Sequence, residues 1–415
     1  MVERNKGWVR MRVLGLMAGG WMGTEKEKLK MKIMNGLIGL VLIVAVGMGC
    51  LIGAGNGDVV IGRKGRIESK ILKETREYAV YLPESYEKTG EKTYPVLVVL
   101  DGEDYFHFLT GVVQYYARLG TVPQMIVVGI DSGDRFMDFT PTRAGIPGGQ
   151  VIETSGGGKL FGRFIEEELL PVVEKNFRVS GFRVLCGHSV AGLFVVEKMV
   201  SAPGSFSGFV ATSPSLWWDR EYVSEEAANE LGKKRMGDRY LFLAVGNEGG
   251  TLEHPIINFT KVLEKYPQAG IHSTFRRFDG VNHQAMPVKA FAYGLEHVFG
   301  DWRLPDEVFE EGLEAVLAYY KALSKKYRQA IVPPEQTLNR LGYRMLRRGM
   351  LEKAIQIFEI NAANYPRSAN VYDSLGEAYM KRDFLNEAIR SYRKSLELDP
   401  TNDNARQMLR KLEMN

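Results

Sequence analysis

The residues of this sequence best suited to chemistry are Gly187-His188-Ser189-Val190-Ala191. A short apolar run, 182–186, precedes them, so the pattern predicts a strand that turns sharply into a helix. Such a turn requires small residues two positions either side of the serine, because bulkier side chains would collide with the neighbouring backbone. The last position holds Ala191 where glycine is usual, and Gly192 follows it. We interpret Ser189 as a nucleophile; the alternative is a glycine-bounded turn without a chemical role.

A serine hydroxyl needs a general base, and the base needs an acid that holds it in the correct tautomer. On this type of turn the partners follow in the order serine, acid, histidine, each after a strand. Of six histidines, His283 is the predicted base, since it follows the strand-like run 273–278 and a glycine-containing break, and His254 is a less well placed alternative. The other histidines are less suitable: His188 lies in the sharp turn itself and His107 precedes the serine. His272 begins a predicted strand, and His297 lies on a helix-like stretch.

The predicted acid is Glu248, which comes just past the end of the apolar run 240–245. Two other carboxylates, Glu253 and Asp279, remain alternatives. Glu248 is favoured because it lies closest to the end of its strand, where an α/β sheet places its functional loops.

The tetrahedral intermediate needs hydrogen-bond donors for its oxyanion. One is predicted to be the backbone N–H of Val190, directly after the nucleophile and at a helix N-terminus, where unpaired N–H groups gather. The other is predicted to be the N–H of Glu103, in the loop after the strand 94–100. Asp101 and Asp104 in the same loop are expected to be solvated turn residues. No histidine or cysteine cluster accompanies them, so no metal site is predicted.

Trp217 and Trp218 follow the predicted strand 206–212. Ligands of α/β sheets bind at the carboxyl ends of the strands, so the two indoles are candidates for the wall of a substrate pocket. The alternative, that both pack against the end of the sheet, is equally consistent with the sequence.

With these residues placed, the chain resembles the esterase family that includes enterochelin esterases, feruloyl esterases, S-formylglutathione hydrolases and mycobacterial mycolyltransferases. The resemblance runs from about residue 67 to 300. It implies the α/β-hydrolase fold, with a mostly parallel central sheet and flanking helices, and it implies acyl chemistry on an ester or thioester. The segments that carry it are YPVLVVLDGEDYF, VVGIDSGDRFMDFTPT, FGRFIEEELLPVVEKNF, GHSVAGL and ATSPSLWWD.

The net charge of +4 over 415 residues does not indicate a nucleic-acid partner, because the positive charge is concentrated at one end of the chain. Residues 1–32 hold eight Lys or Arg against three Asp or Glu, so the rest of the chain sums to −1. A body with that balance lacks the basic surface typical of nucleic-acid binding.

A stretch of 25 residues without charge lies between Lys32 and Asp58. This length spans a bilayer, and the preceding lysines would stay on the cytoplasmic side. We expect an export signal or an uncleaved anchor, which makes the protein periplasmic or membrane-anchored, with Cys50 as a degraded lipoprotein site. Met22 or Met31 is a candidate true start.

The C-terminal region repeats with a period of 34 residues between 335–368 and 369–402. Its Leu-Gly, Ala, aromatic and Pro positions resemble the tetratricopeptide repeat, an all-α helical module. From this resemblance we expect the region to bind a protein partner or to mediate self-association. A bridging helix is predicted over 306–328. The chain is thus divided into a leader (1–57), an α/β-hydrolase domain (58–300), a bridging helix and linker (301–334), and two repeats with a capping helix (335–415).

These observations predict a serine esterase acting on a small or medium acyl ester, with siderophore and feruloyl-type esters as candidates. Ser189 attacks, His283 transfers the proton and Glu248 orients it. No metal or organic cofactor is implied. Two other classes remain open: an acyltransferase with the same triad, and a non-catalytic scaffold that binds a partner through its repeats.

Overall fold

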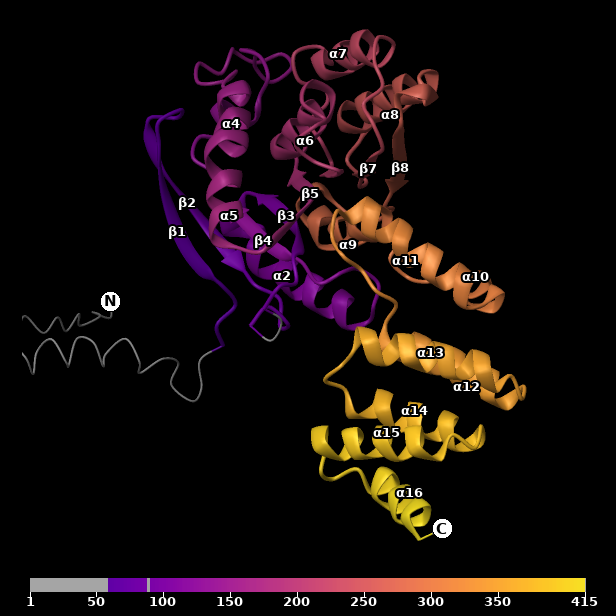
Figure 1. Ribbon diagram of the computed structural model, residues 1–415. Helices are drawn as coiled ribbons and strands as arrows, with labels where there is room; N and C mark the ends of the chain where they lie inside the picture. Colours follow the sequence, from indigo (N-terminus) through magenta and orange to yellow (C-terminus); the bar gives the residue numbers. More distant parts are fainter. Residues whose placement is uncertain (1–58, 88–89, 415) are drawn as a thin grey trace, which may run out of the picture. The chain divides into compact units, whose positions relative to one another are not determined.

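The computed structural model describes residues 59–87 and 90–414 (Figure 1). The predicted leader, the uncharged stretch, Cys50 and the alternative start positions lie outside the described residues. Among the described helices, none has the length and apolar character needed to cross a membrane. Residues from Ile61 onward form one compact unit, and the boundaries at 300 and 334 remain sequence-based predictions.

An eight-stranded sheet in the order β1-β2-β4-β3-β5-β6-β7-β8 forms the centre of the esterase region. Strands β1, β2 and β4 pair antiparallel, and every pairing from β4 through β8 is parallel, which confirms the predicted mostly parallel sheet. The strands are β1 (Arg63–Ser69), β2 (Glu74–Tyr81), β3 (Tyr94–Leu100), β4 (Ile126–Ile130), β5 (Val179–His188), β6 (Gly208–Thr212), β7 (Arg239–Val245) and β8 (Ile271–Arg277).

Helices cover both faces of the sheet, which explains why β3 is apolar at every position. Side chains of a strand alternate between the two faces, so Val96 and Val98 pack with one set of helices and Leu97 and Val99 with the other. The first set is α4 (Gly158–Phe164), α5 (Leu170–Asn176), α6 (Val190–Ser201), α7 (Tyr222–Leu231) and α8 (Gly250–Lys265). The second set includes α2 (Gly102–Arg118), α9 (Met286–Val298) and α11 (Leu313–Tyr327). Shorter elements are α3 (Arg135–Phe139), η1 (Ile165–Leu169), η2 (Pro267–Ala269) and η3 (His283–Ala285).

The prediction of a single bridging helix over 306–328 is wrong in one respect. The structure contains two helices there, α10 (Asp306–Glu311) and α11, separated by Gly312. Gly312 has φ 108° and ψ −160°, a conformation that side-chain-bearing residues rarely adopt, so the helix ends at the glycine and restarts after it.

The repeat region is all-helical, as predicted, and its equivalent positions pack alike. In each repeat the alanine and the aromatic are fully buried: Ala354 with Phe358, and Ala388 with Tyr392. The helices are α12 (Glu335–Arg347), α13 (Leu351–Asn364), α14 (Ala369–Lys381), α15 (Leu385–Leu398) and the capping α16 (Asp403–Glu413).

Candidate active site

Ser189 occupies the sharp turn that the sequence predicts. Strand β5 ends at His188 and α6 begins at Val190, and Ser189 between them has φ 61° and ψ −119°. Such a backbone is strained for a serine and is typical of a nucleophile held at the end of a strand. A Cβ on Gly187 would lie 2.7 Å from the carbonyl oxygen of Ala191 and 3.1 Å from its methyl group, so the missing side chain at 187 makes room for alanine at 191.

One imidazole connects the predicted nucleophile to the predicted acid. The hydroxyl of Ser189 lies 2.9 Å from Nε2 of His283, and Nδ1 of the same ring lies 2.6 Å from Oε2 of Glu248. A carboxylate oxygen only accepts, so Nδ1 carries the hydrogen and Nε2 is left to accept from the serine. The three residues follow β5, β7 and β8, whose carboxyl ends lie at one edge of the sheet.

The carboxylate of Glu248 is buried and fully engaged. Its side chain is 1 % exposed, and Oε1 accepts from the Ser213 hydroxyl and from the Gly246 N–H at 3.0 Å. Burial by itself raises the pKa of such a group, but the hydrogen bonds from His283, Ser213 and Gly246 outweigh it and lower the pKa of Glu248. The acid is therefore ionised at neutral pH and can stabilise a positive charge on His283.

The two alternative acids pair with an arginine, and the alternative base is exposed. Arg277, on β8, donates to Glu253 at 2.7 Å and forms an ion pair with Asp279 at 3.1 Å. His254 is exposed on α8. The structure thus brings Glu248 and His283 together with the serine and leaves these three alternatives apart.

The two predicted oxyanion donors stand in the first turns of two helices. Val190 is the first residue of α6 and Glu103 the second of α2, where backbone N–H groups lack intrahelical acceptors. The strands before these helices, β3 and β5, are adjacent and parallel, so the two turns lie at the same edge of the sheet. The arrangement is suited to binding a negative oxygen beside Ser189.

Asp101 differs from its prediction as a solvated turn residue. It is 2 % exposed, and both its carboxylate oxygens accept from Arg135, at 2.9 and 2.8 Å. Arg135 also donates to the carbonyl oxygen of His188 at 3.4 Å. The pair therefore ties the loop after β3 to the nucleophile turn. Asp104 is exposed as predicted, but it lies in the first turn of α2 and not in a loop.

His188 lies directly against the catalytic candidates. Its Nδ1–H donates to the Thr212 carbonyl at 3.0 Å, and its ring centre is 4.5 Å from that of His283. Burial, reinforced by the neighbouring His283, lowers the pKa of His188 to about 4. The residue is therefore neutral at physiological pH and adds no charge beside the proposed base.

The two tryptophans differ from each other. Trp218 is fully buried, its indole N–H donates to Thr142, and its ring stacks with Phe136. Because it has no exposed surface, Trp218 fits the alternative of packing inside the protein and not that of lining a substrate pocket. Trp217 is partly exposed and touches Trp218, so the pocket role remains a prediction for Trp217 alone.

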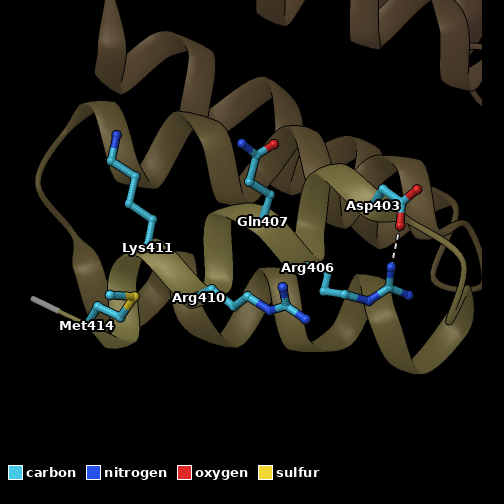
Figure 2. Close-up of a pocket in the computed structure, with 6 residues that line it drawn as sticks. All are labelled: Asp403, Arg406, Gln407, Arg410, Lys411 and Met414. Atoms are coloured by element: carbon cyan, nitrogen blue, oxygen red, sulfur yellow. Dashed lines mark hydrogen bonds and ion pairs between the residues drawn. The ribbon is translucent and has the colours of Figure 1, made fainter.

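A hollow of about 730 Å³ on α16 contains none of the triad candidates (Figure 2). Its lining is rich in cations, and Arg406 pairs with Asp403. The remaining lining residues are Gln407, Arg410, Lys411 and Met414.

Several contributors to the site were missed from the sequence: Ser213, Gly246, Arg135 and the buried state of Asp101. A signal existed for Ser213, because it immediately follows a strand in the same way as the predicted site residues. For Arg135 the only available signal was its membership of the segment that carries the family resemblance, which says nothing about its partner.

Comparisons with known proteins agree with this geometry. Residues 69–286 match the family described as "Putative esterase", and residues 369–402 match the tetratricopeptide repeat. The ferri-bacillibactin esterase BesA of Bacillus subtilis is 27% identical over 259 residues, covering 57% of this chain and 89% of that protein. The siderophore triacetylfusarinine C esterase of Aspergillus fumigatus is 25% identical over 255 residues, covering 52% and 85%.

Among solved structures, an IroE-like serine hydrolase from Shewanella oneidensis superposes with a TM-score of 0.62 at 28% identity. The match covers 73% of this chain and 99% of that one. The similarity therefore extends over the whole of the smaller enzyme and shows the same fold.

Proposed function

The chain belongs to this family of carboxylic ester hydrolases, and we propose that Ser189, His283 and Glu248 form its catalytic triad. The observation that carries the proposal is the single imidazole of His283, hydrogen-bonded to Ser189 on one side and to Glu248 on the other. The strained backbone at Ser189 and the burial of Glu248 support the same assignment.

In the proposed reaction, Oγ of Ser189 attacks the ester carbonyl carbon while its proton passes to Nε2 of His283. The N–H groups of Val190 and Glu103 bind the oxyanion of the tetrahedral intermediate. Collapse of the intermediate breaks the bond to the alcohol, which leaves with the proton from Nε2. Water then attacks the acyl-enzyme with His283 again as base, and the carboxylic acid is released.

We propose a siderophore ester as the substrate. The support is the naming of several relatives, BesA and the Aspergillus fumigatus protein among them, as esterases of siderophores. Feruloyl esters and simple acyl esters are the alternatives, and an acyltransferase would use the same triad with an alcohol in place of water.

The test combines active-site labelling with turnover. A fluorophosphonate probe should label the wild-type protein at Ser189, and Ser189→Ala should abolish both labelling and hydrolysis, a loss of about 10⁶ in kcat for a triad nucleophile. Ser224→Ala is the matched control, because this buried serine lies on α7 and its hydroxyl has no hydrogen-bond partner among the described residues.

Substrate class is decided by a panel of siderophore esters, feruloyl esters and nitrophenyl esters of graded chain length. The proposal expects the highest kcat/KM for a siderophore ester, with free acid as the product even when an alcohol acceptor is added. Labelling that persists in Ser189→Ala would contradict the triad, and a transferred acyl group would identify an acyltransferase.

We also propose that the repeats bind a protein partner or a second copy of the chain, and that the N-terminal region directs export. The first rests on the match to the tetratricopeptide repeat. The second rests on the uncharged stretch that follows a lysine-rich segment in the sequence.

A further inference from the structure

The segment that leaves β6, residues 212–215, contacts the nucleophile and the acid of the proposed triad. Strand β6 lies between β5, which precedes Ser189, and β7, which precedes Glu248. The segment is buried, and Thr212 and Ser213 have no exposed surface. The polar groups of this segment are therefore shielded from solvent and must find their hydrogen-bond partners inside the protein.

Backbone groups of this segment hold the nucleophile from two sides. The Thr212 carbonyl accepts from the N–H of Ser189 at 3.0 Å, and the N–H of Ser215 donates to the carbonyl of Ser189 at 3.0 Å. The same Thr212 carbonyl accepts from His188. These bonds fix the strained backbone of the turn and do not depend on the side chain at 213.

The side chain of Ser213 acts on the other end of the triad. Its hydroxyl donates to Oε1 of Glu248, while its own N–H donates to the Ala244 carbonyl at 2.7 Å and anchors the residue to β7. With Oε1 engaged by Ser213 and Gly246, the carboxylate is turned so that Oε2 faces His283. Ser213 has φ 44°, in the left-handed region, at the point where the chain leaves β6.

We propose that Ser213 is a positioning residue for the triad, whose hydroxyl fixes the orientation and ionised state of Glu248 and through it the tautomer of His283. This inference rests on the proposed function, since it assigns a task only if Glu248 is the acid. Ser213 itself touches no reacting atom, so it acts on the chemical step through Glu248.

Loss of the hydroxyl leaves Oε1 with one donor, the Gly246 N–H, in a place where the carboxylate is almost fully shielded from water. A hydrogen bond to a charged group in such a place stabilises it strongly. We expect Ser213→Ala to lower kcat by about 10- to 100-fold while KM changes by less than about 3-fold.

The pH profile gives a readout that a merely structural role would not move. Burial raises the pKa of Glu248, and the Ser213 hydroxyl is one of the hydrogen-bond donors that lower it. Without this donor Glu248 takes up a proton at higher pH, and a protonated acid no longer orients His283. The acid limb of kcat/KM should therefore shift toward higher pH in Ser213→Ala. Another titratable group, His188, interacts electrostatically with both His283 and Glu248, and Arg135 acts in turn on His188. Both residues are unchanged in the variant.

A second variant separates the hydroxyl from the backbone. Ser213→Gly also lacks the hydroxyl but relieves the strain of the positive φ, so it should fold at least as well as Ser213→Ala. Both variants should show the same drop in kcat and the same shift of the acid limb. Ser224→Ala, which removes a buried serine hydroxyl without a described partner, should retain wild-type kinetics.

The inference is overturned if Ser213→Gly keeps kcat within about 3-fold of wild type, or if neither variant moves the acid limb. Fluorophosphonate labelling distinguishes this failure from failure of the proposed function. If wild type is labelled at Ser189 and hydrolyses esters while the Ser213 variants match it, only the positioning role fails. If wild type is not labelled at Ser189, the triad assignment and the inference fail together.

Discussion

Replacement of Glu248 by glutamine tests the triad more sharply than removal of the serine, because it keeps the shape of the side chain. The carboxylate accepts at both oxygens: Oε1 from Ser213 and from the Gly246 N–H, and Oε2 from Nδ1 of His283. A glutamine has one oxygen and one NH₂ group, so one of these two places receives a donor.

The surroundings decide which place that is. The Gly246 N–H can only donate, so the amide oxygen of the introduced glutamine should take the place of Oε1, and its NH₂ group should face His283. Nδ1 of His283 must then accept, which puts the hydrogen on Nε2. In that tautomer the ring cannot accept the proton of Ser189, and an amide in place of a triad acid lowers kcat by about 10⁴ for this reason.

The assay is initial-rate hydrolysis of a nitrophenyl ester by wild type and Glu248→Gln over a range of pH, with folding checked by circular dichroism. We expect kcat to fall by about 10³- to 10⁴-fold with little change in KM. Glu253→Gln and Asp279→Asn are matched controls, since both carboxylates pair with Arg277 and lie outside the hydrogen-bonded chain. Each control should stay within about 3-fold of wild type.

Two results would refute the reasoning. Retention of more than about one-tenth of wild-type kcat by Glu248→Gln would mean that no acid at 248 sets the tautomer. A large loss in Glu253→Gln or Asp279→Asn instead would keep the serine and histidine but give the acid's role to another carboxylate.

Three further expectations concern stability, the repeats and location. Burial lowers the pKa of His188 to about 4, so as pH falls this imidazole takes up a proton in the unfolded chain before it does so in the folded protein. The free energy of unfolding should therefore drop by about 3 kcal/mol between about pH 6.5 and 4. Urea titrations of His188→Gln should show a shallower drop, and His107→Gln, at an exposed position, is the control. Truncation after Pro334 should spare hydrolysis of a small ester but lower the Tm, because α12 shares a continuous apolar core with α11. A truncated protein with a normal circular dichroism spectrum and no hydrolysis would show that the repeats complete the active site. Cell fractionation should place the protein in the membrane or periplasm, and palmitate labelling lost in Cys50→Ser would identify a lipoprotein, whereas full-length chain in the cytosol would contradict export.

The strands that position the site were predictable because their sequence patterns are strong. The apolar run at 94–100 is β3 to the residue, and the runs after the serine correspond to β7 and β8. Parallel strands deliver the residues after their carboxyl ends to one edge of a sheet, so the order along the chain of the serine, acid and histidine, each after a strand, suggested which residues could meet. The ring of His283 between Ser189 and Glu248 was thus accessible to prediction from spacing and residue type.

What the sequence did not reveal depends on contacts between distant segments or on the backbone conformation of a single residue. Asp101 was expected in solvent because it lies in the loop after a strand and no histidine or cysteine cluster accompanies it, but Arg135, 34 residues later, pairs with it. The break at Gly312 was hidden by an apolar pattern that continues in helical register on both sides. A tertiary ion pair selects the outcome at Asp101, and the backbone conformation of a single glycine selects it at Gly312.

The position of β6 explains why the first residue that follows it is small and polar. Ser189 and Glu248 follow strands that are two places apart in the sheet, so about 10 Å separates the strand ends, and the ring of His283 must span that gap from the loop after β8. A bulky side chain at the end of β6 would stand between the serine and the acid. Ser213 is small and carries a donor that the carboxylate needs, so one residue both leaves the gap open and fixes one side of it.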